Sequence, residues 1–334
     1  MSAAGQAAGT PAPSRAFKLR RTLSRQAWTL GVVAILVVLL IIEANVAPVF
    51  TSFDIQSLVI SSMPLAFAAM AQSVVVISRG IDLSVGSVMA LTNVTAAQLM
   101  VDQTSLGPAL AISALVLVIG LVIGTINGLA VVYSRVPDIV VTLALSFVWA
   151  GVALIVRATP GGGSPLSFQE LSTASDLWEW VPNGLLVIAA VYLVIWVPLR
   201  SRRLGLAMYA VGSDATAAGL SGVNVDRTRV LAYTVGGLFA AFGGLALTST
   251  TGIGSPLSGN FYTLTSVAAV VIGGVSLAGG KGGLFGPIVA AFILSAAVTV
   301  LVFAGVDANY GQVIQGALIV LMVMLGGLLL RRRG

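Results

Sequence analysis

Residues 109–133 read ALAISALVLVIGLVIGTINGLAVVY, a stretch of 25 residues without a charged side chain. About 20 apolar residues suffice for an α-helix to cross the hydrocarbon core of a bilayer. Gly120, Gly124 and Gly128 recur at every fourth position, so they share one face of such a helix. Small residues on one face let a second helix approach closely. The stretch therefore predicts a membrane-spanning helix with a close-packing seam.

The composition of the whole chain agrees with that first stretch. Of the 334 residues, 57% are hydrophobic and only 8% are charged, against about 25% charged in a typical soluble domain. This excludes a soluble enzyme, a disordered protein and a nucleic-acid-binding protein. The chain has no cysteine and no histidine, which excludes disulfides, metal sites built on those residues, and their catalytic chemistry. We expect no cofactor.

Apolar stretches recur along the chain and predict an all-α, polytopic integral membrane protein in the lipid bilayer. Residues 1–27 are rich in Ala, Gly, Pro and Ser and then basic, and they predict a disordered tail. Residues 28–334 predict a single transmembrane domain. Its expected spans are ten: 28–47, 55–78, 84–101, 109–133, 138–158, 183–199, 229–250, 263–279, 284–304 and 311–330.

The basic residues predict the orientation of these spans. With ten spans and a cytoplasmic N-terminus, every lysine and arginine except Arg157 falls on the cytoplasmic side. Short cytoplasmic loops of membrane proteins carry such an excess. Both termini are therefore expected in the cytoplasm. The outer loop 159–182 carries acidic residues beside two tryptophans. The tryptophans are typical of an aromatic belt, and the acidic residues can meet a partner protein on the outer face.

Two glycine-rich segments suggest a weak parallel repeat, because VVVISRGIDLSVGSVMAL (74–91) aligns with AVVIGGVSLAGGKGGLFGPIVAA (269–291). In the first segment Gly80 permits a tight or left-handed turn, and Asp82 or Ser84 can cap the helix that follows. Gly86 completes the motif. The segment is either a capped turn between two helices or a break near the ligand path. The second segment contains Gly273, Gly274, Gly279, Gly280 and Lys281, and its spacing does not fit a phosphate-binding loop. We expect packing there.

The cytoplasmic stretch 205–229 is the longest and least apolar loop on its side. Ser213 and Asp214 can cap a short helix over 215–220, which Gly222 can end. A helix this short needs a docking surface. Its small and apolar residues either enter a groove on a partner or lie on the chain's own bundle. The coupling residues we select are Ser213, Asp214, Ala217, Ala218, Gly219, Leu220, Gly222 and Asn224.

The spans hold no charged residue near their centres, which argues against proton coupling and against a charged substrate. Neutral polar and aromatic side chains are then expected to line the ligand path. The candidates are Gln72, Asn93, Asn127, Ser146, Trp149, Phe261, Tyr262 and Gln315. Each of them could instead form a hydrogen bond between helices.

Four segments carry a family resemblance: GIDLSVGSVMAL (80–91), GTINGLAVV (124–132), VGSDATAAGLSGVNVDRTR (211–229) and IGGVSLAGGKGGLFGPIVAA (272–291). In order and spacing they resemble the permease subunits of ribose-type sugar ABC importers. The resemblance implies a permease dimer of like or unlike subunits. It also implies a cytoplasmic ATPase and an extracytoplasmic sugar-binding protein as partners. The loop from Asp214 to Asn224 would rest on the ATPase, and the permease itself would hydrolyse no ATP.

Two other classes stay open at this point. A passive channel for small neutral solutes would need no ATPase, and it would leave the coupling-like loop without a role. An integral membrane enzyme would need acidic or basic residues clustered near an interface, and the sequence shows no such cluster.

Overall fold

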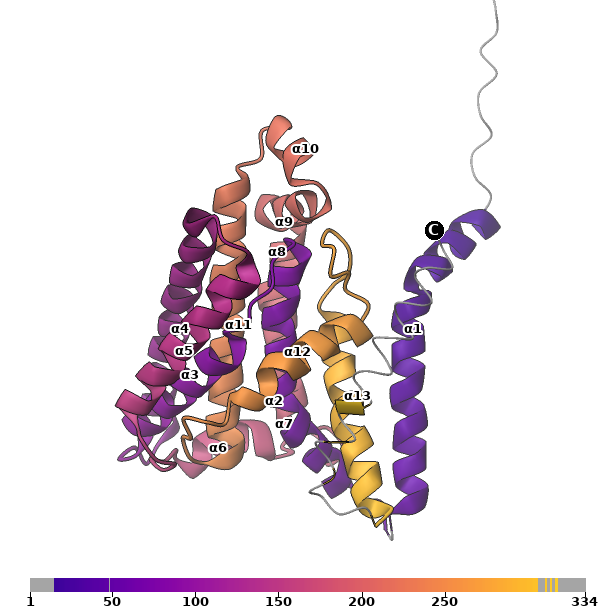
Figure 1. Ribbon diagram of the computed structural model, residues 1–334. Helices are drawn as coiled ribbons and strands as arrows, with labels where there is room; N and C mark the ends of the chain where they lie inside the picture. Colours follow the sequence, from indigo (N-terminus) through magenta and orange to yellow (C-terminus); the bar gives the residue numbers. More distant parts are fainter. Residues whose placement is uncertain (1–14, 48, 306–309, 311–312, 314–315, 318–334) are drawn as a thin grey trace, which may run out of the picture.

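A computed structural model describes residues 15–47, 49–305, 310, 313 and 316–317, and the side chains from Trp28 onwards. Those residues form a bundle of helices joined by short loops (Figure 1). Within this part of the chain there is no β-strand, only two isolated bridges between loop residues. The helices are α1 (Arg15–Val46), α2 (Ser52–Ile77), α3 (Val85–Met100), α4 (Leu106–Ser134), α5 (Asp138–Val156), α6 (Leu166–Thr173), α7 (Asn183–Val191), a π-helical turn (Tyr192–Trp196), α8 (Val197–Ser201), α9 (Arg203–Ser213), α10 (Ala215–Leu220), α11 (Val225–Thr251), α12 (Asn260–Ile272) and α13 (Phe285–Phe303).

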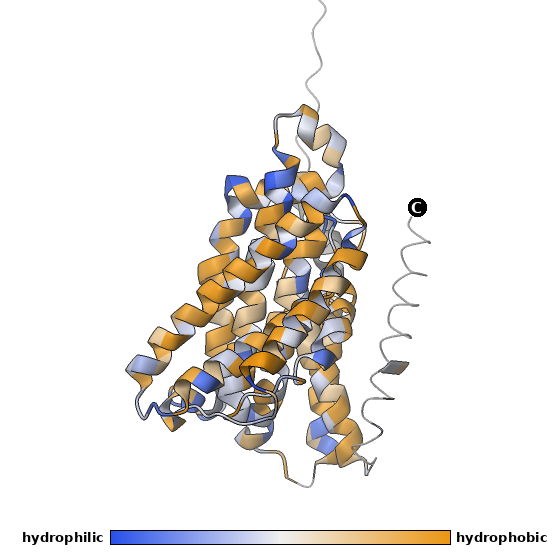
Figure 2. Cartoon of the chain, turned by 60° about the vertical axis from the view of Figure 1, so that its left-hand side comes forward, coloured by the Kyte–Doolittle hydropathy of each residue, from blue (hydrophilic) through white to orange (hydrophobic). Residues whose placement is uncertain are grey.

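Seven of the helical segments are long and apolar enough to cross a membrane: 28–46, 52–77, 106–134, 138–156, 183–201, 225–251 and 285–303. Each coincides with a predicted span, so the structure confirms an all-α, polytopic membrane protein. Figure 2 shows the apolar colouring concentrated on these helices. The tenth predicted span, 311–330, lies almost wholly outside the described residues.

Two of the predicted spans form helices shorter than a full membrane crossing, although α3 matches its predicted limits within one residue at each end. At 1.5 Å per residue, the 16 residues of α3 and the 13 residues of α12 reach about 24 and 20 Å, less than the roughly 30 Å hydrocarbon core. The prediction extended α12 to residue 279 although Gly273 and Gly274 follow Ile272 directly. Paired glycines end a helix, and Gly274 adopts a positive φ of 81°.

The N-terminal tail also differs from the prediction, because α1 begins at Arg15 rather than at Trp28. Residues 15–27, predicted as disordered, continue the first membrane helix toward the N-terminus. Arginine and lysine are good helix formers, so a basic segment can extend an apolar helix by several turns.

The packing is densest along α11 and α2. The predicted seam on α4 lies against α11: a Cβ on Gly120 would come within 2.6 Å of the Gly237 carbonyl oxygen, and one on Gly124 within 2.4 Å of the Tyr233 carbonyl oxygen. Only glycine permits backbones this close. The helix α2 lies between α11, α12 and α13, and 89% of the residues in its most apolar 18-residue stretch are buried.

The bundle has two distinct ends. One end carries α9 and α10, and the other carries α6 and the loops around it (Figure 1). The arginines Arg79, Arg135, Arg202 and Arg203 flank the helices at the α10 end. The acidic side chains of Glu170, Asp176 and Glu179 lie exposed at the α6 end. We refer to these as the α10 end and the α6 end.

Candidate functional site

The helix α10 covers residues 215–220, as the sequence predicts. The Asp214 side chain caps it by accepting a hydrogen bond of 2.9 Å from the Ala217 amide. Gly222, with a φ of 84°, turns the chain so that the Val223 amide donates to the Ala218 carbonyl. Asn224 then caps α11 through the Arg227 amide. A two-turn helix is thus fixed at both ends.

The two faces of α10 differ from the prediction in one respect. Ala218 was expected to face a partner, but it is buried, with only 5% of its surface exposed. The cap at Gly222 folds residues 223–225 back under the helix, so that Ala218 packs against its own chain. Leu220 is 87% exposed, and Ala217 and Gly219 are exposed beside it. The outward apolar group is therefore Leu220.

Residues 78–84, here called the first turn, join α2 to α3. The left-handed residue in it is Arg79, with a φ of 67°, and not Gly80 as predicted. Gly80 is required for a different reason. A Cβ there would lie 2.8 Å from the Tyr233 hydroxyl and 2.9 Å from a Val75 methyl. Glycine at this position allows close packing rather than an unusual backbone angle.

A chain of buried hydrogen bonds holds the far side of the first turn. Asp82 accepts from the Ser84 amide at 2.8 Å and from the Ser84 hydroxyl at 2.5 Å. Asn127 of α4 donates to that hydroxyl oxygen, and Trp149 of α5 donates to the Asn127 side-chain oxygen. Asp82 thus holds Ser84, the residue directly before α3, but among the described residues no side chain caps the helix itself, in contrast to the prediction from the sequence. Two further helices support Ser84 through Asn127 and Trp149.

A second group of side chains holds the near side of the first turn. Tyr233 of α11 donates to the Asp138 carboxylate at 3.0 Å, and its hydroxyl also lies 3.3 Å from the Ile81 carbonyl. Arg229 forms an ion pair with Asp138 at 2.6 Å. Thr142 bonds with the first turn as well, accepting from the Leu83 amide. The ion pair joins the start of α5 to the start of α11.

This second group of side chains was not predicted from the sequence. Asp138 and Arg229 lie 91 positions apart, so no local pattern links them. The available signal was Asp138 directly after Pro137, at the start of an apolar helix. That signal predicts a charge at the helix N-terminus but not its partner.

Residues 273–284, here called the second turn, join α12 to α13. It has four glycines with positive φ, at Gly274, Gly279, Gly280 and Gly282. The two helices that this turn joins, α12 and α13, lie in close contact beside it. A Cβ on Gly273, directly after α12, would lie 2.1 Å from the Pro287 nitrogen at the start of α13. The predicted role in packing fits this geometry. In the pair α2–α3 the short helix α3 follows the turn, whereas in the pair α12–α13 the short helix α12 precedes it.

The two turns meet under the end of α9. The Gly280 amide donates to the Ile77 carbonyl at 2.9 Å. Gly212 of α9 lies against this junction, where a Cβ would be 1.9 Å from the Ile77 oxygen and 2.6 Å from the Gly280 nitrogen. Ser213 contacts Gly280 in turn. The helix α10 begins at Ala215, directly after these contacts.

The predicted path residues differ in whether their polar groups already have hydrogen-bond partners. Asn93, Asn127 and Trp149 use their hydrogen bonds within the bundle; Asn93 ties α3 to Thr248 and to the Ser255 amide. Ser146 donates to its own helix, and Phe261 and Tyr262 pack edge to face. Gln72 is completely buried, and neither its amide nitrogen nor its oxygen has a partner among the described residues. Gln315 lies outside them.

Gly86, selected with the motif of the first turn, serves packing, since a Cβ there would be 2.3 Å from the Gly259 oxygen.

These features define a class of protein. The bundle spans a membrane. At the α10 end the turns of the pairs α2–α3 and α12–α13 meet, and the short capped helix α10 lies above that junction. Within the described residues no cluster of three or more acidic residues could hold a metal. This is the architecture of a multi-pass, all-α membrane protein.

The chain belongs to the family described as "branched-chain amino acid transport system / permease component", whose model matches residues 55–323. It is 31% identical to the ribose import permease of Escherichia coli K12 over 310 residues, which cover 90% of this chain and 94% of that protein. It is 30% identical to the fructose import permease of Rhizobium meliloti over 285 residues, 82% of this chain and 78% of that protein. The ribose import permease of Bacillus subtilis is 33% identical over 264 residues, 77% and 79% of the two chains. No solved structure matches the chain.

Proposed function

We propose that the chain is the permease subunit of an ABC importer that moves a neutral sugar related to ribose or fructose into the cytoplasm. The relatives named for ribose and fructose import support the substrate class. The chemistry of the bundle also supports it. The buried charged residues of the described chain are Glu43 and Asp82, and Asp82 bonds to Ser84. A zwitterionic amino acid would need both a cationic and an anionic partner, whereas a sugar needs neutral donors and acceptors.

The observation that carries the coupling part of the proposal is the position of α10. Its exposed Leu220 stands above α9, whose end lies against both turns. We place the α10 end in the cytoplasm, where α10 docks on a separate ATPase. ATP binding and hydrolysis on that subunit displace α10, and the two turns shift so that the bundle opens to one side at a time. Either a second copy or a related permease completes the pathway, and a sugar-binding protein delivers substrate at the α6 end.

Gln72 is the path residue that the geometry favours. A buried amide without a partner costs about 1–3 kcal/mol, and sugar hydroxyls can both donate to and accept from it. We assign it to the sugar path of the open states. The other neutral candidates, Ser146 on α5 and Phe261 and Tyr262 on α12, lie on two helices that both pack against α3.

The test is uptake of labelled ribose, fructose and leucine by cells that produce the chain with its ATPase and binding protein. We expect uptake of one of the sugars, no uptake of leucine, and loss of uptake when the ATPase carries an inactive nucleotide site. Uptake that persists with the inactive ATPase would favour a passive channel. Uptake of leucine in place of sugar would overturn the substrate class.

A further inference from the structure

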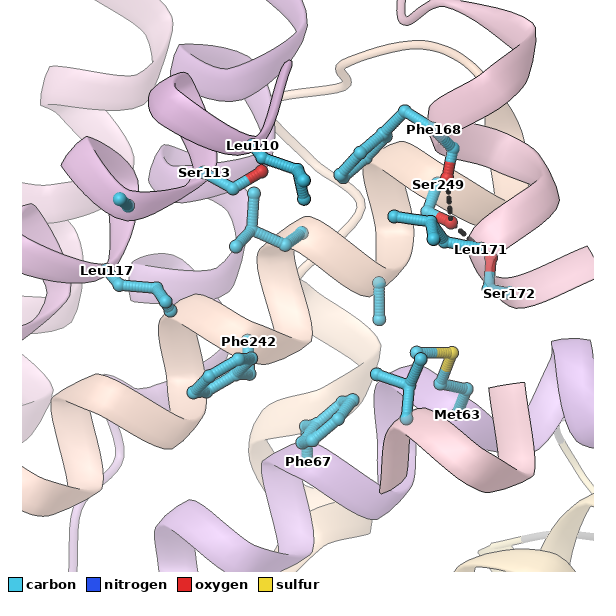
Figure 3. A pocket seen from close by; sticks show the side chains of 14 residues that line it. Met63, Phe67, Leu110, Ser113, Leu117, Phe168, Leu171, Ser172, Phe242 and Ser249 are labelled. Atoms are coloured by element: carbon cyan, nitrogen blue, oxygen red, sulfur yellow. Dashed lines mark hydrogen bonds between the residues drawn. The ribbon is translucent and has the colours of Figure 1, made fainter. Parts of the chain in front are cut away.

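An apolar cavity lies near the α6 end, away from both turns and from α10. Its volume is about 280 Å³, and five helices line it. Figure 3 shows Phe67 of α2, Leu110 and Leu117 of α4, Phe168 of α6 and Phe242 of α11 around the open space. For comparison, an apolar cavity of about 150 Å³ in another protein holds a benzene molecule.

The polar groups in the wall are already in use. Three serines line the cavity, and the Ser113 hydroxyl donates to the Ala109 carbonyl of its own helix. The hydroxyls of Ser172 and Ser249 contact each other, and Ser249 also reaches the Phe168 carbonyl (Figure 3). No free hydroxyl proton then faces the space, so it offers little to a sugar and little to water, which needs two to four polar partners.

The cavity is continuous with the surface that faces lipid. Leu110 lines the cavity and is 49% exposed, and Ala114, one turn further along α4, is exposed beside it. Val187 of α7 forms the other side. On α4, Leu115 and Val118 are about half exposed. Hydrocarbon covers such side chains in a bilayer, so it also stands at the mouth of the cavity.

The depth of the cavity fits one leaflet. The lining residues of α4 extend from Leu110 to Leu117, about 10 Å along the helix axis, and the last of them lies about 16 Å from the start of the helix at Leu106. This is about half of the roughly 30 Å hydrocarbon thickness. The short helix α6 closes the end with Phe168 and Leu171.

We propose that this cavity binds one hydrocarbon chain of a phospholipid from the leaflet at the α6 end. The chain enters sideways between α4 and α7 and lies under α6. A filled cavity regains the dispersion contacts that an empty one loses. A helix of a second copy, about 10 Å across with its side chains, is too wide to enter a space of this size. Because Phe67 and Phe242 stack in its wall at 5.5 Å, the bound chain stabilises the packing of α2 on α11.

The test uses the full chain in nanodiscs of phosphatidylethanolamine with a small fraction carrying a diazirine on the acyl chain. After illumination, labelled peptides are mapped by mass spectrometry. We expect label on Phe168 and Leu171 of α6 at a level at least equal to that on the exposed α5 residues Phe147 and Ile155. Ala114→Phe fills the mouth and should lower the α6 label at least fivefold, with the α5 label unchanged.

Ala111→Phe is the matched control, because Ala111 is exposed on the same helix and does not line the cavity. Its α6 label should equal that of the wild type. The proposal is overturned if α6 carries no label above background, or if Ala114→Phe and Ala111→Phe label alike. An Ala114→Cys variant that forms a disulfide-linked dimer in the membrane would also overturn it, in favour of a second copy at this face. The experiment requires no transport and is independent of the substrate.

Discussion

The first turn and the second turn each join a long helix to a short one, but different parts of the chain hold them. Side chains from α4, α5 and α11 bond to the first turn, through Asn127, Thr142 and Tyr233. The second turn relies on four glycines with positive φ and on few side-chain bonds, of which Tyr209 to the Gly282 carbonyl is one. The first turn can therefore move only together with three helices, whereas the second turn is set by its own backbone.

The difference suggests how a displacement of α10 divides between the two turns. Gly212 contacts Gly280 of the second turn and Ile77, the last residue before the first turn. In the proposed mechanism the first turn would pass this displacement to α4, α5 and α11 together, because side chains of all three bond to it. The second turn can absorb part of it locally, because glycine passes between backbone regions at little steric cost.

The largest expected effect comes from filling the contact between the turns. Gly212→Val would place a Cβ 1.9 Å from the Ile77 oxygen and 2.6 Å from the Gly280 nitrogen. Both neighbours are backbone and cannot yield, so we expect a loss of about 3 kcal/mol or more, seen as a lower melting temperature in detergent, and no transport. Gly283→Val is the control, since nothing lies within 4 Å of a Cβ there. Wild-type melting and uptake in Gly212→Val would show that α9 does not rest on the two turns.

The next effect concerns the side-chain support of the first turn. Asp82→Ala removes the acceptor for the Ser84 amide and hydroxyl, and both groups are buried. We expect a destabilisation of about 1–3 kcal/mol and reduced uptake from protein that still inserts. Asp82→Asn keeps an acceptor oxygen and should recover part of the loss. Full transport in the alanine variant would remove Asp82 from the site.

A smaller effect is expected from the glycine backbone of the second turn. Gly279 has a φ of 84°, and a Cβ would lie 2.7 Å from the Gly212 oxygen. Gly279→Ala should cost about 1–2 kcal/mol, with uptake reduced more than stability. Gly283→Ala, in the same turn without positive φ, should resemble the wild type. Equal behaviour of these two variants would contradict the role assigned to the glycine backbone.

The smallest effect is expected at Tyr209, whose hydroxyl donates to the Gly282 carbonyl at 2.8 Å. Tyr209→Phe should lower the free energy of unfolding by about 0.5–1.5 kcal/mol. Burial raises the pKa of Tyr209 above its ordinary value of 10, so the phenol stays protonated and keeps this bond until the pH rises through that raised pKa. The difference between variant and wild type should therefore be the same at pH 6 and pH 9. A difference that disappears by pH 9 would contradict this assignment.

Much of the fold could be predicted from the sequence, because long apolar stretches and glycine spacing are local signals. The α4 seam, the limits of α10 and the Asp214 cap all follow from residues within a few positions of one another. The burial of Ala218, the left-handed Arg79 and the Asp138–Arg229–Tyr233 group depend on contacts between distant helices, which periodicity does not contain. The short length of α12 depends on where glycines end a helix, and the paired Gly273 and Gly274 carried that signal.

In the proposed mechanism the α10 end faces the cytoplasm and Leu220 contacts an ATPase. The chain contains no cysteine, so Leu220→Cys and Ser175→Cys each introduce a single thiol, one at each end of the bundle. We predict that a membrane-impermeant maleimide labels position 220 only in inverted vesicles, that the bound ATPase protects it there, and that position 175 is labelled only in intact cells. Labelling of position 220 from outside intact cells, or labelling in inverted vesicles that the ATPase leaves unchanged, would contradict this mechanism.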